Sequence, residues 1–122
     1  MKSMRNLKTL LFFGIGGYAL YKLLGKGNVA ASTNAPNLVI YERYLSRGDR
    51  GPGVEAVQIA LNYLGYAVGP VDGIFGPQTE EAVRRFQMDM RISIDGIVGP
   101  QTQRALDEQL RARGGSFVYM GV

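Results

Sequence analysis

The chain has 122 residues, which is room for one small domain with appended segments. It contains no cysteine and no histidine, which excludes disulfides, thiolate metal sites, the commonest general base and the commonest zinc ligand. The net charge of +4 is unevenly distributed: residues 1–41 carry five cations and no acid, while residues 42–122 carry nine arginines and ten acids. Residues 42–122 therefore lack the excess of positive charge that nucleic-acid binding requires.

The N-terminal part has the pattern of a membrane segment. Residues 1–8 are basic, and residues 9–24 are apolar apart from Lys22. We expect 9–24 to be a transmembrane signal anchor. A cleavable signal peptide is the alternative, because the small residues at 29–31 could form a cleavage site. Against cleavage, Lys22 and Lys26 lie between the apolar segment and that cleavage site. Residues 25–44 are predicted to be a linker with a short strand at 38–44.

Three helices are predicted after a turn cluster at residues 47–53. The first spans about 54–64, with apolar residues on one stripe, and the others span about 77–90 and 100–113. Gly65 and the Gly114-Gly115 pair are the expected helix ends. The tail, residues 114–122, is apolar, and it is left open whether it pairs with 38–44, docks on the domain or meets a partner.

A repeat underlies the second and third helices. Residues 72–83 and 95–106 agree at eight of twelve positions, at an offset of 23. Each copy has the form Asp-Gly-x-x-Gly-Pro, abbreviated here as a DGxxG turn. Asp-Gly favours a turn, the second Gly falls at a helix N-cap, and proline suits the first helical position. We therefore assign structural roles to Asp72, Gly73, Gly76, Asp95, Gly96 and Gly99.

The segment from about 45 to 106 resembles the peptidoglycan-binding domain found at the ends of many bacterial cell-wall hydrolases. The resemblance is carried by both DGxxG turns and by Leu45-Ser46-Arg47-Gly48-Asp49, Val57-Gln58, Leu64-Gly65-Tyr66 and Phe86-Gln87. Two departures are Gln103, where the family often has Trp, and Arg91-Ile92 in place of Gly-Leu. The resemblance implies an all-α, three-helix domain over residues 45–113.

The available side chains favour binding over catalysis. Asp72 and Asp95 are better explained as turn residues than as a catalytic pair, and one carboxylate per turn is too few for calcium. We therefore expect no enzyme activity, metal or cofactor. Sugars and peptide groups are bound by aromatic, amide and guanidinium side chains, and the ligand-binding candidates are Tyr66, Tyr63, Gln58, Phe75, Gln87 and Arg91.

Several of these candidates have a structural explanation as well. Phe75 suits a core position, and Gln58 and Gln87 suit the satisfaction of buried loop amides. For Tyr66 the structural explanation and the ligand-binding explanation are the most evenly balanced. We expect the ligand groove to lie beside Tyr66 and the first DGxxG turn.

The resemblance implies a non-catalytic peptidoglycan-binding module, and the apolar segment at 9–24 leads us to expect that it is tethered to a membrane. Its partners would be peptidoglycan and, through residues 9–24, the lipid bilayer, with the domain on the extracytoplasmic side. Two alternatives stay open. One is a structural or adaptor protein in the membrane of a membrane-containing bacteriophage virion. The other is the targeting subunit of a lytic complex with a catalytic partner. Nucleic acid is not expected as a partner.

Overall fold

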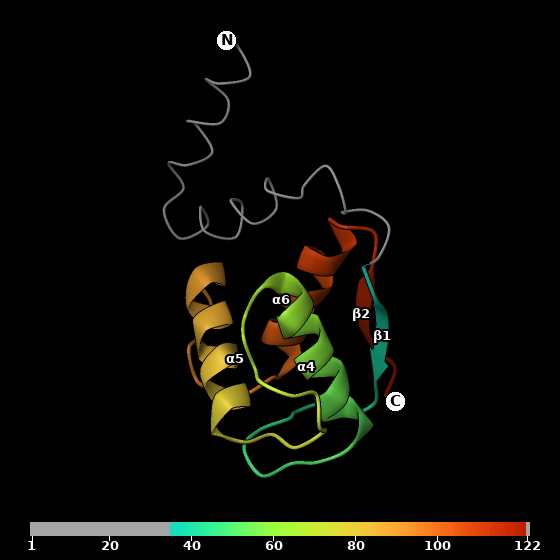
Figure 1. Cartoon of the computed structure of the whole chain (residues 1–122). Coiled ribbons are helices and arrows are strands. Elements are labelled where there is room, and N and C mark those ends of the chain that lie inside the picture. The colour runs from blue at the N-terminus through green and yellow to red at the C-terminus, as the bar shows by residue number, and fades with distance from the viewer. Residues whose placement is uncertain (1–34, 122) are drawn as a thin grey trace.

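The computed structural model describes residues 35–121, and the predicted membrane segment at 9–24 lies outside them. The elements are β1 (Asn37–Ile40), α4 (Pro52–Leu64), α5 (Pro77–Met90), α6 (Pro100–Arg111) and β2 (Ser116–Tyr119). The helices lie side by side, and the two strands lie along one flank of α4 and α6 (Figure 1). Within 35–121, no helix is both long and apolar enough to span a bilayer.

The three helices begin as the sequence predicts. Each has a glycine at the N-cap, no side-chain cap and a proline in its first turn. Proline has the backbone angle of a helix and lacks only an N–H that the first turn cannot use. The observed bounds differ from the predicted ones by two residues at the start of α4 and at the end of α6. Gly65 ends α4 in the left-handed conformation, at φ 100°.

The two short strands correct the prediction of an all-α fold. β1 and β2 are parallel, with Leu38 opposite Phe117 and Ile40 opposite Tyr119. The predicted strand at 38–44 is real but spans 37–40, and the tail pairs with it. A parallel pair needs a crossover, and here the crossover is the whole helical domain, so no local pattern reveals the pairing.

The strands also complete the core. Ile40 and Phe117 are 1% and 2% exposed, and Phe117 N–H donates to Asp107 Oδ1 on α6 at 2.8 Å. The apolar stripe predicted on the first helix is buried in α4. On α5 the side chains that face the core are Thr79, Ala82, Val83 and Phe86, which are buried, and Met90, which is half-buried. The core therefore lies between the three helices and the sheet.

Candidate functional site

The first DGxxG turn is held by one buried amide. Gln58 of α4 is 1% exposed, and its Nε2 donates to Thr79 Oγ1 at 3.1 Å and to the Ile74 carbonyl at 3.0 Å. The same nitrogen donates to Asp72 Oδ1 at 3.1 Å. In return, Gln58 Oε1 accepts from the backbone N–H groups of Asp72 and Gly73 at 3.0 and 2.9 Å. Gln58 therefore satisfies polar groups of the first turn from inside the domain.

The second turn repeats this network with Gln87 of α5. Gln87 is fully buried, and its Nε2 donates to Asp95 Oδ1, the Ile97 carbonyl and Thr102 Oγ1 at 2.9–3.0 Å. Its Oε1 accepts from the N–H groups of Asp95 and Gly96 at 3.0 and 2.9 Å. Each helix thus supplies the glutamine that organises the turn after it.

Both aspartates accept backbone hydrogen bonds within their own turns. Asp72 Oδ1 accepts from the Ile74 N–H, and Asp95 Oδ1 accepts from the Ile97 N–H, each at 3.0 Å. The Ile74 N–H and the Gln58 amide hold the pKa of Asp72 below its ordinary value, because both stabilise the carboxylate. Across residues 35–121, no group of three or more acidic side chains is arranged to hold a metal ion.

A lead-in segment, residues 45–51, ties both turns to the start of α4. The backbone N–H and carbonyl of Leu45 pair with those of Val98, at 3.1 and 2.8 Å. Asp49 accepts from Phe75 N–H at 2.9 Å, and Gly51 N–H donates to Gly73 at 2.9 Å. Gly73 has a φ of 73°, which lies in the left-handed region that favours glycine.

The two departures from the family pattern have clear structural roles. Gln103 is 5% exposed, and its Nε2 donates to the carbonyls of Glu42 and Arg43 at 3.2 and 2.9 Å. It therefore joins α6 to the chain leaving β1. Arg91 ends α5 in the left-handed conformation, at φ 60° and ψ 42°. Within residues 35–121, it is the only non-glycine residue with positive φ.

The ligand candidates separate into buried and accessible groups. Gln58, Gln87 and Phe75 are at most 1% exposed, so their surfaces are occupied by the turns and the core. Arg91 is exposed and Tyr63 is half-buried. Tyr66 is 5% exposed, its ring packs edge-on against Phe86 at 5.5 Å, and its hydroxyl donates to Asp89 Oδ2 at 2.6 Å.

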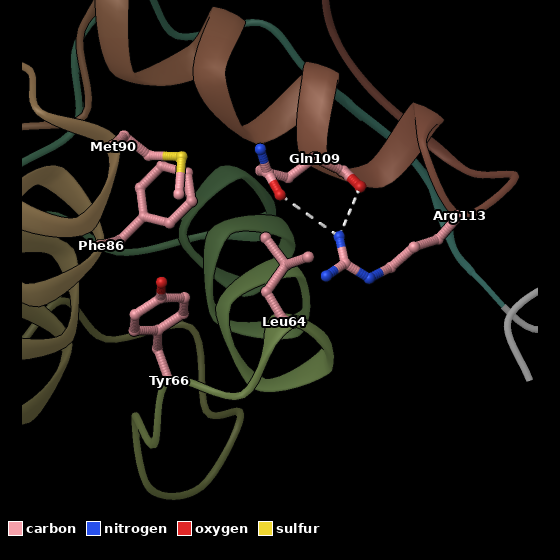
Figure 2. A pocket seen from close by; sticks show the side chains of 6 residues that line it. All are labelled: Leu64, Tyr66, Phe86, Met90, Gln109 and Arg113. Atoms are coloured by element: carbon pink, nitrogen blue, oxygen red, sulfur yellow. Dashed lines mark hydrogen bonds between the residues drawn. The ribbon is translucent and has the colours of Figure 1, made fainter. Parts of the chain in front are cut away.

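Two hollows meet at Tyr66. The first is a cleft too narrow to hold water, lined by Leu64, Tyr66, Phe86, Met90, Gln109 and Arg113 (Figure 2). Arg113 donates to the Gln109 carbonyl at 2.7 Å. Its side chain pairs with no carboxylate of the described chain, and burial lowers its pKa. This cleft is a narrow gap with a mainly apolar lining, to which Arg113, two residues after the end of α6, adds a charged group.

The second hollow is larger and open to solvent. Its volume is about 250 Å³, and its lining is Gly65, Tyr66, Arg85, Met88 and Asp89. We call it the Tyr66 hollow. No residue of either DGxxG turn lines it. The turns lie at the ends where the helices begin, whereas Gly65 follows the end of α4 (Figure 1). The groove that we expected beside the first turn is therefore not built from turn residues.

Three residues of this hollow were not among the predicted candidates. Arg85, Met88 and Asp89 are spaced as one face of α5, and Arg85 forms an ion pair with Glu81, at 3.3 Å. Met88 is 50% exposed. Their spacing was available from the sequence, but two charges and a methionine on a helix usually form a solvated face. Only the packing of Tyr66 against α5 turns that face into a hollow.

The fold and the glutamine-organised turns define a small helical binding module. Residues 50–106 match the family described as "Putative peptidoglycan binding domain". The N-terminal domain of SleB is 34% identical over 57% of this chain and 97% of its own, with a TM-score of 0.56.

Two longer proteins are similar as well. A peptidoglycan-binding protein from Clostridioides difficile, in complex with glutamine hydroxamate, is 42% identical over 55% of this chain, with a TM-score of 0.53. A protein of Kitasatospora aureofaciens, described as an uncharacterized protein in the bpoA1 3′ region, is 40% identical over 84 residues, which is 65% of this chain. This chain spans 42% and 66% of those two proteins, so the matches do not transfer the activity of either whole protein.

Proposed function

We propose that this chain is a non-catalytic peptidoglycan-binding module, tethered to a membrane through residues 9–24 and facing the cell wall. The family match over residues 50–106 is the observation that carries the choice of ligand. The chain has neither histidine nor cysteine, and its two turn aspartates are engaged in hydrogen bonds within the turns. Binding is therefore the chemistry that these residues support best.

The Tyr66 hollow is the proposed ligand site. It combines the exposed thioether of Met88, the guanidinium of Arg85 and the carboxylate of Asp89. Apolar surface with a few convergent polar groups is typical of small-molecule sites. Wall polymers offer apolar sugar faces, amides and charged peptide groups, and each has a counterpart in this lining. Gly65 adds no side chain, so a ligand can approach the backbone there.

Co-sedimentation with purified sacculi tests this proposal. The full chain, kept soluble with detergent, should sediment with sacculi and release no soluble wall fragments. Met88→Trp should fill the hollow and weaken binding at least tenfold. Ile94→Trp is the matched control, because Ile94 is 48% exposed and lies outside the hollow. It should bind as the unaltered chain does.

Each outcome has a defined meaning. Failure of the unaltered chain to sediment would contradict peptidoglycan binding and favour an adaptor role without affinity for glycan. Equal sedimentation of both tryptophan variants would place the site elsewhere on the domain. Release of soluble fragments would contradict the non-catalytic assignment.

The membrane tether has its own test. The full chain produced in bacteria should stay with membranes after alkaline carbonate washing, whereas a chain lacking residues 1–34 should be washed free. Protease added outside spheroplasts should cut the domain if it faces the wall. Recovery of the full chain in the carbonate supernatant would contradict the tether.

A further inference from the structure

We infer that the Tyr66 hollow recognises a free α-amino-acid head group, meaning an ammonium and a carboxylate on one carbon. In wall peptides, the side chain of diaminopimelate carries this group when it is not cross-linked, whereas a lysine side chain carries an ammonium alone. The inference deepens the proposed function and rests on it. It names the part of the polymer that the hollow takes.

Two opposite charges flank the hollow without neutralising each other. Arg85 and Asp89 are four residues apart on α5, which is about 6 Å along the helix axis. Arg85 pairs through Nε with Glu81, and Asp89 accepts from Tyr66. In the part of the chain that the structure describes, no ion pair joins Arg85 to Asp89. A positive and a negative group are thus presented together to the same space.

The aspartate is the rigid end of this pair. Tyr66 is 5% exposed and packs edge-on against Phe86, so its hydroxyl is fixed in position. The 2.6 Å hydrogen bond from that hydroxyl holds Asp89 Oδ2, and the carboxylate of Asp89 is part of the lining of the hollow. A carboxylate held in this way is a preorganised acceptor for an ammonium group.

The arginine is the adaptable end. Its Nε is engaged with Glu81 at 3.3 Å, and both side chains are more than half exposed. An exposed pair of this kind contributes little to stability, so its terminal nitrogens can turn toward a carboxylate at small cost. A guanidinium binds a carboxylate through two parallel hydrogen bonds, and this selects for that group.

The size of the hollow agrees with such a ligand. A volume of about 250 Å³ equals roughly eight water molecules at about 30 Å³ each. That is enough for an amino-acid head and part of its methylene stem, which Met88 and the bare backbone of Gly65 can accommodate.

Peptide titrations with the full chain in detergent test this inference. The probes are L-Ala-γ-D-Glu-meso-diaminopimelate, the matching peptide ending in L-Lys, and free meso-diaminopimelate. The diaminopimelate peptide should bind about tenfold to a hundredfold more tightly than the lysine peptide, since the lysine side chain has no carboxylate beside its ammonium for Arg85 to bind. Arg85→Gln should abolish this preference, and Asp89→Asn should weaken binding of both peptides.

Two matched controls lie on the exposed surface of α6. Arg104→Gln and Glu108→Gln make the same chemical changes at residues that line neither hollow. Both should keep the preference for the diaminopimelate peptide. Circular dichroism of all four variants should match that of the unaltered chain, because each replaces a charged side chain that is not buried by an uncharged polar one.

The results separate this inference from the proposed function. If sacculi bind but the two peptides bind equally, or Arg85→Gln keeps the preference, the head-group assignment is wrong while wall binding stands. If free diaminopimelate binds and sacculi do not, both the wall-peptide source and the proposed function are overturned. Sacculus binding together with a preference that Arg85→Gln removes supports both.

Discussion

Replacing either turn-organising glutamine by methionine should cost about 3 kcal/mol of folding stability. Methionine keeps the length of the side chain but offers neither amide group. In Gln58→Met, the Gly73 N–H, which is buried, loses its partner, at a cost of about 1–3 kcal/mol. The Asp72 N–H and the Ile74 carbonyl lose theirs too, but both residues are exposed and water can replace the bonds, so each adds about 0.5 kcal/mol.

The same reasoning gives the same cost for Gln87→Met, because the second network matches the first to within 0.2 Å at every shared contact. The described domain should have a total stability of roughly 4–13 kcal/mol. Each variant should therefore lower Tm by on the order of 15 °C. Urea unfolding followed by circular dichroism measures the difference.

Gln78→Met is the matched control, since Gln78 is exposed at the start of α5 and outside both networks. It should change stability by no more than about 0.5 kcal/mol. A loss below about 1 kcal/mol in both core variants would refute the view that these amides hold the turns. A large loss in only one would show that the two turns are not equivalent.

Three further changes test the fold. Phe117→Ala should destabilise the domain by about 3–4 kcal/mol in urea unfolding, because it removes the buried aromatic ring of β2 and leaves a cavity in the core. A loss under about 1 kcal/mol would mean that the strands do not complete the core. Arg91→Gly should raise stability by roughly 0.5–1 kcal/mol by removing the strain at φ 60°, and an unchanged or lower Tm would contradict that strain. The pKa of Asp72 in the folded chain is below its ordinary value, so the ionised carboxylate stabilises the fold above that ordinary pKa, and this contribution is lost as pH falls through the folded pKa. Asp72→Asn should therefore lose less Tm than the unaltered chain between about pH 5 and pH 2.5, and equal losses would show that Asp72 does not contribute.

Local chemistry made the helical part of the fold predictable. Each helix start follows from a Gly-Pro pair, and each turn follows from Asp-Gly, so neither depends on distant contacts. The role of Gln58 was also accessible, because a buried amide must find partners and the turn supplies them. The sheet was not accessible in this way. Its strands are joined only through contacts such as the 3.0 Å bond from Ser116 to Asn37, 79 residues apart.

The candidate site was less predictable than the fold. Tyr66 was recognised from its position after Leu64-Gly65, but the pattern could not show that its ring would be buried against Phe86. Arg85 and Asp89 have the spacing of ordinary solvated charges on a helix. Their relation to Tyr66 depends on how the loop after α4 packs on α5, and this contact is set by tertiary structure alone.

The positions of the turns and of the hollow suggest how a ligand would be oriented. None of the glutamines and aspartates that satisfy the turns lines the Tyr66 hollow, so the hollow is left for binding. Asp89 lies next to the last residue of α5, where the helix dipole favours positive charge, and Arg85 lies one turn earlier. A bound amino-acid head should therefore place its ammonium toward Met90 and its carboxylate toward the start of α5. The dipole and the side-chain charges favour the same orientation, and the reversed head group would oppose both.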